Sequence, residues 1–395
     1  MDHGHSLRGG RRAHPPALLA LLIPMLLVTV VGVVAFWPDT GRARSIVELD
    51  FGAELVDGTV ERVSIGECAS TAPGTGIECT VASVRLTSGP DKGDTFELEI
   101  QDSVTSVVLD DGDKIVLNHV TDAGVPDDLR YSFADFQRKT PLVLLVALFI
   151  IAVIALGRVQ GLRALLGLAV SLLVLVQFVI PSILDGNDAV LVALVGAALV
   201  MLAALYLAHG VNERTTTAVV GTFLSLGLTG LLATVFVGLA DITGLADEDA
   251  RILTIATEQI DIRGLLLGGI IIGALGVLDD VTVTQVSAVW ELHFAAPEKG
   301  PRELYRAALR IGRDHIASTV NTLVLAYAGA SLPLLVLFVQ AERGLVDVLT
   351  GETLASEIIR TLVGSIGLVA AVPITTAIAA AVVTRRHWAS GSGHA

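Results

Sequence analysis

Gly264–Trp290 (GLLLGGIIIGALGVLDDVTVTQVSAVW) is a largely apolar stretch that carries two adjacent carboxylates, Asp279 and Asp280. A transmembrane helix needs roughly 20 apolar residues, so this stretch is long enough to span a bilayer. A carboxylate within a span is costly, and it usually faces protein or water and marks a pathway or a relay. The stretch therefore predicts a polytopic membrane protein with a polar site in its helical bundle.

The rest of the chain supports the same class. Of its 395 residues, 53% are hydrophobic, which is high for a soluble domain. Length and apolar character together predict an all-α polytopic bundle of about eight transmembrane helices. We expect these spans at about 17–37, 141–157, 164–181, 189–208, 217–240, 264–290, 318–340 and 357–384.

The first predicted span has the look of a signal sequence because it follows Arg8, Arg11 and Arg12. Ala35–Pro38 offers no small-x-small cleavage site, so we expect an uncleaved signal anchor. The chain then divides into a basic cytoplasmic amino terminus (1–16), the anchor (17–37), a polar domain (38–140), a seven-helix membrane domain (141–385) and a cytoplasmic tail (386–395).

Basic residues gather in alternate loops, and the positive-inside rule places those loops in the cytoplasm. This orientation predicts that both termini are cytoplasmic. The many arginines and alanines, with only 4 lysines, suggest a GC-rich bacterial genome and hence the plasma membrane of a bacterial cell. The bases of the predicted inner loops are Arg158, Arg163, Arg214, Lys299, Arg302, Arg306, Arg310, Arg313, Arg385 and Arg386.

Residues 38–140 form a polar block that we expect outside the cytoplasm. It holds 20 acidic residues against 9 basic ones, which argues against a nucleic-acid partner. Short apolar runs alternate with turn clusters and predict a small β-rich domain, an OB or SH3-like barrel or a sandwich, with a less regular β-rich module as the alternative. The runs are 63–65, 81–86, 96–100 and 114–117, and the turns are 88–93 and 110–113.

The two cysteines, Cys68 and Cys79, both lie in this block and flank a short segment rich in Pro, Gly, Ser and Thr. In an extracytoplasmic domain they would form a disulfide, whereas an inverted topology would leave two free thiols. Two further segments have helical signals. Residues 252–259 show helical spacing in a predicted outer loop, and Pro301 is a suitable start for a helix in a predicted inner loop.

Polar residues on two consecutive spans outline a candidate site. On a helix, Asp280, Thr284, Ser287 and Glu291 form one stripe, and Asp279, Thr282 and Gln285 lie on a neighbouring face. We expect the two Asp side chains to converge with polar groups near the start of the next span. The candidate binding residues are Asp279, Asp280, Thr284, Gln285, Asp314, His315 and Asn321.

This mixture can bind a cation, relay a proton or hydrogen-bond a small polar solute, and spacing alone does not choose among them. The metal, if any, is left open, and no cofactor is expected. The structural alternative is that these groups meet headgroup water or hold helices together. The small-xxx-small spacings 264/268 and 269/273 predict close helix packing.

GALGVLDDVTVTQVSAVWEL and GRDHIASTVNTLVLAYAGASLPLL, after an amino-terminal anchor and an extracytoplasmic segment, resemble the YibE/F family of multipass bacterial membrane proteins over about 140–385. The resemblance implies the topology and suggests a permease. No HExxH, GxSxG or GxGD-type motif occurs in the spans, so we do not expect an enzyme. Our leading hypothesis is a transporter in the lipid bilayer, with a homo-oligomer allowed. The alternative is an assembly or sensor protein whose outer domain binds a partner.

Overall fold

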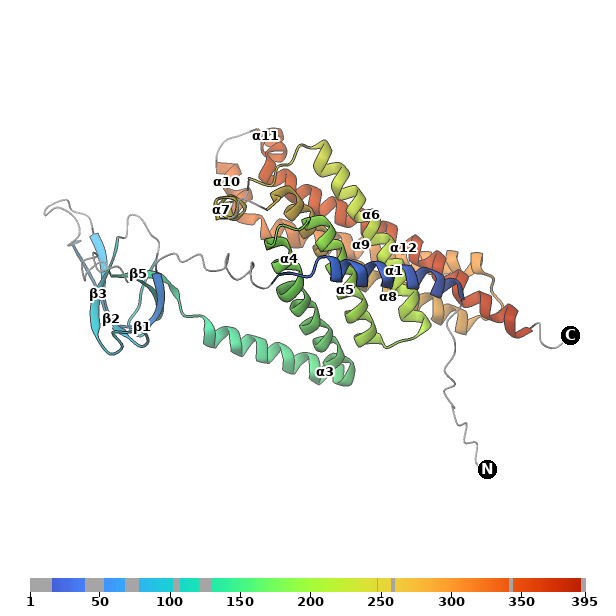
Figure 1. Ribbon diagram of the computed structural model, residues 1–395, viewed down its shortest axis with the longest axis horizontal. Coiled ribbons are helices and arrows are strands. Elements are labelled where there is room, and N and C mark those ends of the chain that lie inside the picture. Colours follow the sequence, from blue (N-terminus) through green and yellow to red (C-terminus); the bar gives the residue numbers. More distant parts are fainter. Residues whose placement is uncertain are drawn as a thin grey trace, which may run out of the picture. The chain divides into compact units, whose positions relative to one another are not determined.

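The computed structural model describes residues 16–39, 53–67, 78–101, 107–120, 130–246, 248–256, 260–340 and 344–391 (Figure 1). The chain divides into two compact units. One covers Glu48–Leu156 and contains a β-sheet, and the other combines Met1–Val47 with Gly157–Ala395 and is helical.

The sheet has five antiparallel strands in the order β3-β2-β1-β4-β5. The four predicted apolar runs all lie in strands, so the β-rich character of the polar block is confirmed. Valine and isoleucine alternate with polar residues in these runs, which buries one face of the sheet, including Val56, Val84, Ile115 and Leu117. The strands are β1 (Ala53–Glu67), β2 (Glu78–Leu86), β3 (Thr95–Gln101), β4 (Lys114–Val120) and β5 (Tyr131–Phe136).

The described strands form one open sheet, where the sequence predicted a barrel or a sandwich. The backbone ladder ends at β3 and β5. These edge strands approach each other through side chains instead, since the ring centroids of Phe96 and Tyr131 are 4.8 Å apart. The alternation of apolar residues predicts which segments are strands, but it does not determine whether the two backbone edges pair. Cys68 lies outside the described residues, so the Cys68–Cys79 disulfide stays a prediction.

Helices make up the remainder of the described chain. Pro301 begins a helix as predicted, and the predicted outer loop before residue 264 contains the short helix α7. The helices are α1 (Pro16–Ala35), α3 (Lys139–Val174), which continues through a π-helical turn η2 (Leu175–Val179) into α4 (Ile180–Leu184), α5 (Ala189–His209), α6 (Glu213–Leu239), α7 (Glu248–Ala256), α8 (Ile262–Ala295), α9 (Pro301–Ala330), α10 (Leu332–Gln340), α11 (Leu345–Thr350) and α12 (Glu352–Gly391).

Among the described residues, six helices are long and apolar enough to cross a membrane, or seven if α9 and α10 count as one bent span. The predicted count was eight. The difference arises because the predicted spans 141–157 and 164–181 belong to one helical run of 46 residues, Lys139–Leu184. No proline separates them, so helical structure resumes directly after a break at Arg158, where φ is 49°.

The helix that contains both carboxylates, α8, is central to the helical unit. It packs against α5, α6, α9 and α12. Its glycines allow close approach on one side, because a Cβ atom at Gly268 would lie 3.1 Å from the Cβ atom of Ala193 and 3.2 Å from the carbonyl oxygen of Ala189. The 264/268 spacing thus marks the α5–α8 contact, as predicted, whereas an added Cβ atom at Gly269 would meet no atom within 4 Å.

Candidate functional site

Asp279 is partly buried beside a small polar cluster between α6 and α8. The hydroxyl of Thr222 on α6 lies next to its carboxyl group. The Thr222 hydroxyl oxygen lies 2.6 Å from that of Thr282, which is completely buried on α8. The Thr282 hydroxyl in turn donates to the backbone carbonyl of Asp279 over 3.1 Å. Two hydrogen bonds thus join Asp279 and Thr282 on α8 to Thr222 on α6.

Close packing of α12 against α6 brings further hydroxyls to the same part of the bundle. At Gly221, next to Thr222, an added Cβ atom would lie only 2.5 Å from the hydroxyl oxygen of Thr375 on α12. The hydroxyl of Thr375 and the Oδ1 atom of Asp279 are buried without a hydrogen-bond partner in the described chain. A buried polar group of this kind is costly, so a ligand or water is the expected partner of each of these two oxygens.

Asp280 points away from this cluster. It is exposed, and the hydroxyl of the next residue on its stripe, Thr284, bonds back to the Asp280 carbonyl within the same helix. Neighbouring residues on a helix are rotated by about 100°, so adjacent carboxylates necessarily face different surroundings. The two acids that look equivalent in the sequence are therefore different in the fold.

Gln285 connects α8 to α9. Its side-chain nitrogen donates to the carbonyl of Ala308 over 2.9 Å, and the residue is buried. Gly312 makes room for it, because a Cβ atom there would lie 2.9 Å from the side-chain oxygen of Gln285. This predicted site residue therefore has a clear packing role.

The polar groups at the start of the seventh predicted span divide between two faces of α9. Asp314 and Asn321 are exposed, whereas His315 is partly buried and its Nε2 atom has no partner. Within the described ranges, no hydrogen bond or ion pair joins these residues to Asp279 or Asp280, and no group of three His, Cys, Asp or Glu residues is arranged to hold a metal ion. The geometry thus brings Asp279 to α6 rather than to α9.

Sequence analysis missed Thr222 as the neighbour of Asp279. The available signal was the unusual run of hydroxyl residues along α6, where Thr222, Ser225 and Thr229 recur at helical spacing and are all fully buried. Such a stripe would have suggested a polar contact for α6. It could not have identified the facing helix.

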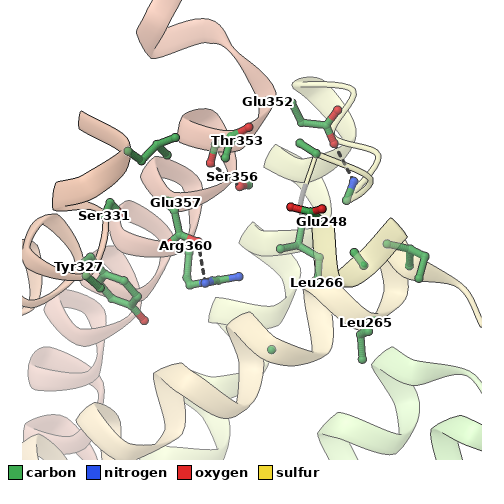
Figure 2. A pocket seen from close by; sticks show the side chains of 17 residues that line it. Glu248, Leu265, Leu266, Tyr327, Ser331, Glu352, Thr353, Ser356, Glu357 and Arg360 are labelled. Carbon is green, nitrogen blue, oxygen red and sulfur yellow. Dashed lines mark hydrogen bonds and ion pairs between the residues drawn. The ribbon is translucent and has the colours of Figure 1, made fainter. Parts of the chain in front are cut away.

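A second polar region is a cavity of about 610 Å³ near the bend between α9 and α10 (Figure 2). Arg360 and Glu357 on α12 form an ion pair there, with 2.7 Å between Nη1 and Oε1. Glu352 also lines the cavity, and its Oε1 atom accepts hydrogen bonds from the hydroxyl and amide of Thr243 and from the amide of Gly244, each 2.7 Å long. Sequence analysis did not assign this cavity.

These features define a class: a multipass membrane protein with six or seven candidate spans among the described residues. A family model described as YibE/F-like protein matches residues 145–385. The chain belongs to this family, and the resemblance seen in the sequence is confirmed. No curated protein and no solved structure matches the chain.

Proposed function

We propose that this protein is a transporter, not an enzyme, and that Asp279 binds the proton or cation that moves or that drives a solute. The observation that carries the proposal is the pair of buried hydroxyls, Thr222 and Thr282, next to the carboxyl group of Asp279. A neutral carboxyl group can donate a hydrogen bond to a threonine hydroxyl, whereas an ionised one can only accept.

Loss of the carboxyl proton leaves a negative charge beside these hydroxyls. The oxygen atoms of Thr222 and Thr282, with the unpartnered Oδ1 atom of Asp279, then offer ligands to a hard cation. A carboxylate within a span that alternates between these states is the usual element of a proton or ion pathway. This alternation supports transport over a purely structural role.

The proposal includes a topology of eight spans with both termini in the cytoplasm and the sheet outside. A helical run of 46 residues is about 69 Å long, roughly twice the hydrocarbon thickness of 30 Å, which supports two spans meeting at Arg158. The bent pair α9 and α10 supplies one further span. Cysteines introduced at Asp91 should react with an impermeant reagent from outside and those at Lys299 only from inside. Outside labelling at Lys299 would overturn this orientation.

Ion flux into proteoliposomes tests the transport role. With an imposed membrane potential and a pH-sensitive dye inside the vesicles, the wild-type protein should carry protons, or exchange them for Na⁺ or K⁺ supplied outside. Asp279→Asn keeps the shape and a donor for Thr222 but removes the titrating group, so flux should fall at least about tenfold, the scale set by one charged contact.

Asp280→Asn is the matched control because it removes the same charge from the next residue, which is exposed. It should keep flux within about twofold, in line with a surface change of less than about 0.5 kcal/mol. Equal flux in wild type and Asp279→Asn, with both proteins folded, would refute the role of Asp279. An equal loss of flux in both variants would assign the effect to net charge rather than to the contact of Asp279 with the buried hydroxyls.

A further inference from the structure

The cavity beside the α9–α10 bend is the strongest unassigned feature of the helical unit. Its volume of about 610 Å³ lies within the usual range of small-molecule sites, about 300–1,000 Å³. Its walls combine apolar side chains, such as Leu265, Leu266 and Leu334, with a small number of charged groups. This combination is typical of sites in which apolar walls provide affinity and a few polar groups orient the ligand.

Among the described residues that line the cavity, Arg360 is the only basic one. An arginine has five N–H donors, and in the described chain only its Nη1 atom has a partner, Glu357. Figure 2 shows the guanidinium group extending from α12 into the open space. A fork of N–H donors in a partly apolar site suits a carboxylate or phosphate oxygen pair.

The acidic groups offer the opposite charge. Glu248 and Glu357 both line the cavity, whereas Glu352 is already used to hold the turn at Thr243 and Gly244. The carboxyl end of α9 also reaches the cavity at Ala330 and Ser331, and the end carbonyls of a helix favour a positive charge. Broken membrane helices use this feature to bind cationic groups.

We infer that this cavity binds a small zwitterionic group, with its anionic oxygens at Arg360 and its ammonium at Glu357 and Glu248. A simple anion does not fit, since the glutamates outnumber the arginine, and a simple cation leaves the donors of Arg360 unused. Two sources share this chemistry, a free amino-acid-like solute and the ethanolamine headgroup of a lipid. The inference deepens the proposed function, because the solute would be the cargo coupled to Asp279.

Calorimetric titration of the full-length protein in lipid-depleted detergent tests this binding. The probes are leucine and dileucine as zwitterions, with leucinol and 4-methylvalerate as analogues that keep one charge each. At least one zwitterion should bind, at least tenfold more tightly than either single-charge analogue. No binding by either zwitterion, or equal binding by an analogue, would overturn the inference.

A parallel titration in nanodiscs distinguishes the two sources. If the site is for a free solute, replacing phosphatidylglycerol with phosphatidylethanolamine should leave leucine or dileucine binding unchanged. If the site belongs to a headgroup, phosphatidylethanolamine should compete and weaken binding at least fivefold. Both results keep the zwitterion site and assign its natural occupant.

Variants locate the site and separate it from Asp279. Arg360→Gln and Glu357→Gln should each weaken zwitterion binding at least tenfold, whereas Arg214→Gln, which breaks the ion pair of Arg214 with Glu291 elsewhere, should change it less than twofold. Asp279→Asn should also bind normally. Absent binding with intact proton flux overturns only this inference, and absent flux with intact binding overturns only the transport proposal.

Discussion

Two faces of α8 contrast in their surroundings. One face packs against α6 and α12, and it buries Thr282 and brings Asp279 to Thr222. The other carries Asp280 and Thr284 in exposed positions, and an added Cβ at Gly269 or Gly276 would meet no atom within 4 Å. The contrast teaches that intramembrane position alone does not define a site. Helix packing decides which of the two carboxylates is turned toward another helix.

The largest effect should come from Gly221 on α6, the helix that covers the buried face of α8, at the point where α12 packs against it. Gly221→Ala places a Cβ atom 2.5 Å from the hydroxyl oxygen of Thr375, and β-branched Thr375 has little freedom to move. We expect destabilisation of about 2 kcal/mol, in the range for overpacking, seen as a lower thermal unfolding midpoint in detergent.

Gly276→Ala on the exposed face is the matched control for Gly221→Ala. There the new methyl group meets nothing within 4 Å, and alanine favours a helix over glycine by up to about 1 kcal/mol. The unfolding midpoint should stay the same or rise. If the unfolding midpoint of Gly276→Ala fell as far as that of Gly221→Ala, the buried helix contact and the exposed face of α8 would not differ in their tolerance of a methyl group.

Removal of one buried hydroxyl should have the next largest effect. Thr222→Val keeps the side-chain shape but deprives Asp279 and Thr282 of their shared partner. We expect a loss of about 1–1.5 kcal/mol, near the upper measured range for hydrogen bonds between membrane helices, together with reduced proton flux. Thr284→Val should change stability by less than about 0.5 kcal/mol because Thr284 is exposed. Equal effects of the two changes would contradict the contrast.

A smaller effect is expected where α8 meets α9. Gln285→Met keeps the length of the side chain but removes the donor to the carbonyl of Ala308. We expect a loss of about 0.6 kcal/mol, the average for such interhelical bonds, with proton flux unchanged. Thermal unfolding and the flux assay together check this, and a loss of flux without a loss of stability would place Gln285 in the transport site instead of the helix contact.

The sequence predicted the membrane class, the acidic span, four of the described strands and the helix beginning at Pro301, because apolar periodicity and turn residues are local signals. It did not predict that the partner of Asp279 is on α6, because helix spacing shows which residues share a face and not which helix covers that face. The predicted eight spans also differ from the six or seven candidate helices. The apolar runs on either side of Arg158 follow each other without a loop, and only a kink at that residue divides them.

An effect of similar size is expected outside the membrane-spanning helices, where the same rule applies. Tyr131 is buried at the edge of the sheet, and its hydroxyl donates to the carboxylate of Asp91 over 2.6 Å. Burial first, and then this hydrogen bond, raise the pKa of Tyr131 above its ordinary value. Because the folded pKa is raised, the stabilisation is fully present below the unfolded pKa of about 10 and is lost as the pH rises above it.

Tyr131→Phe should cost about 0.5–1 kcal/mol at neutral pH, the lower part of the range for a hydrogen bond at a partly exposed site. Thermal unfolding should show this difference at pH 7 and a smaller one above pH 10. A difference that stays constant across this pH range would show that the ring, and not the hydroxyl, accounts for the effect.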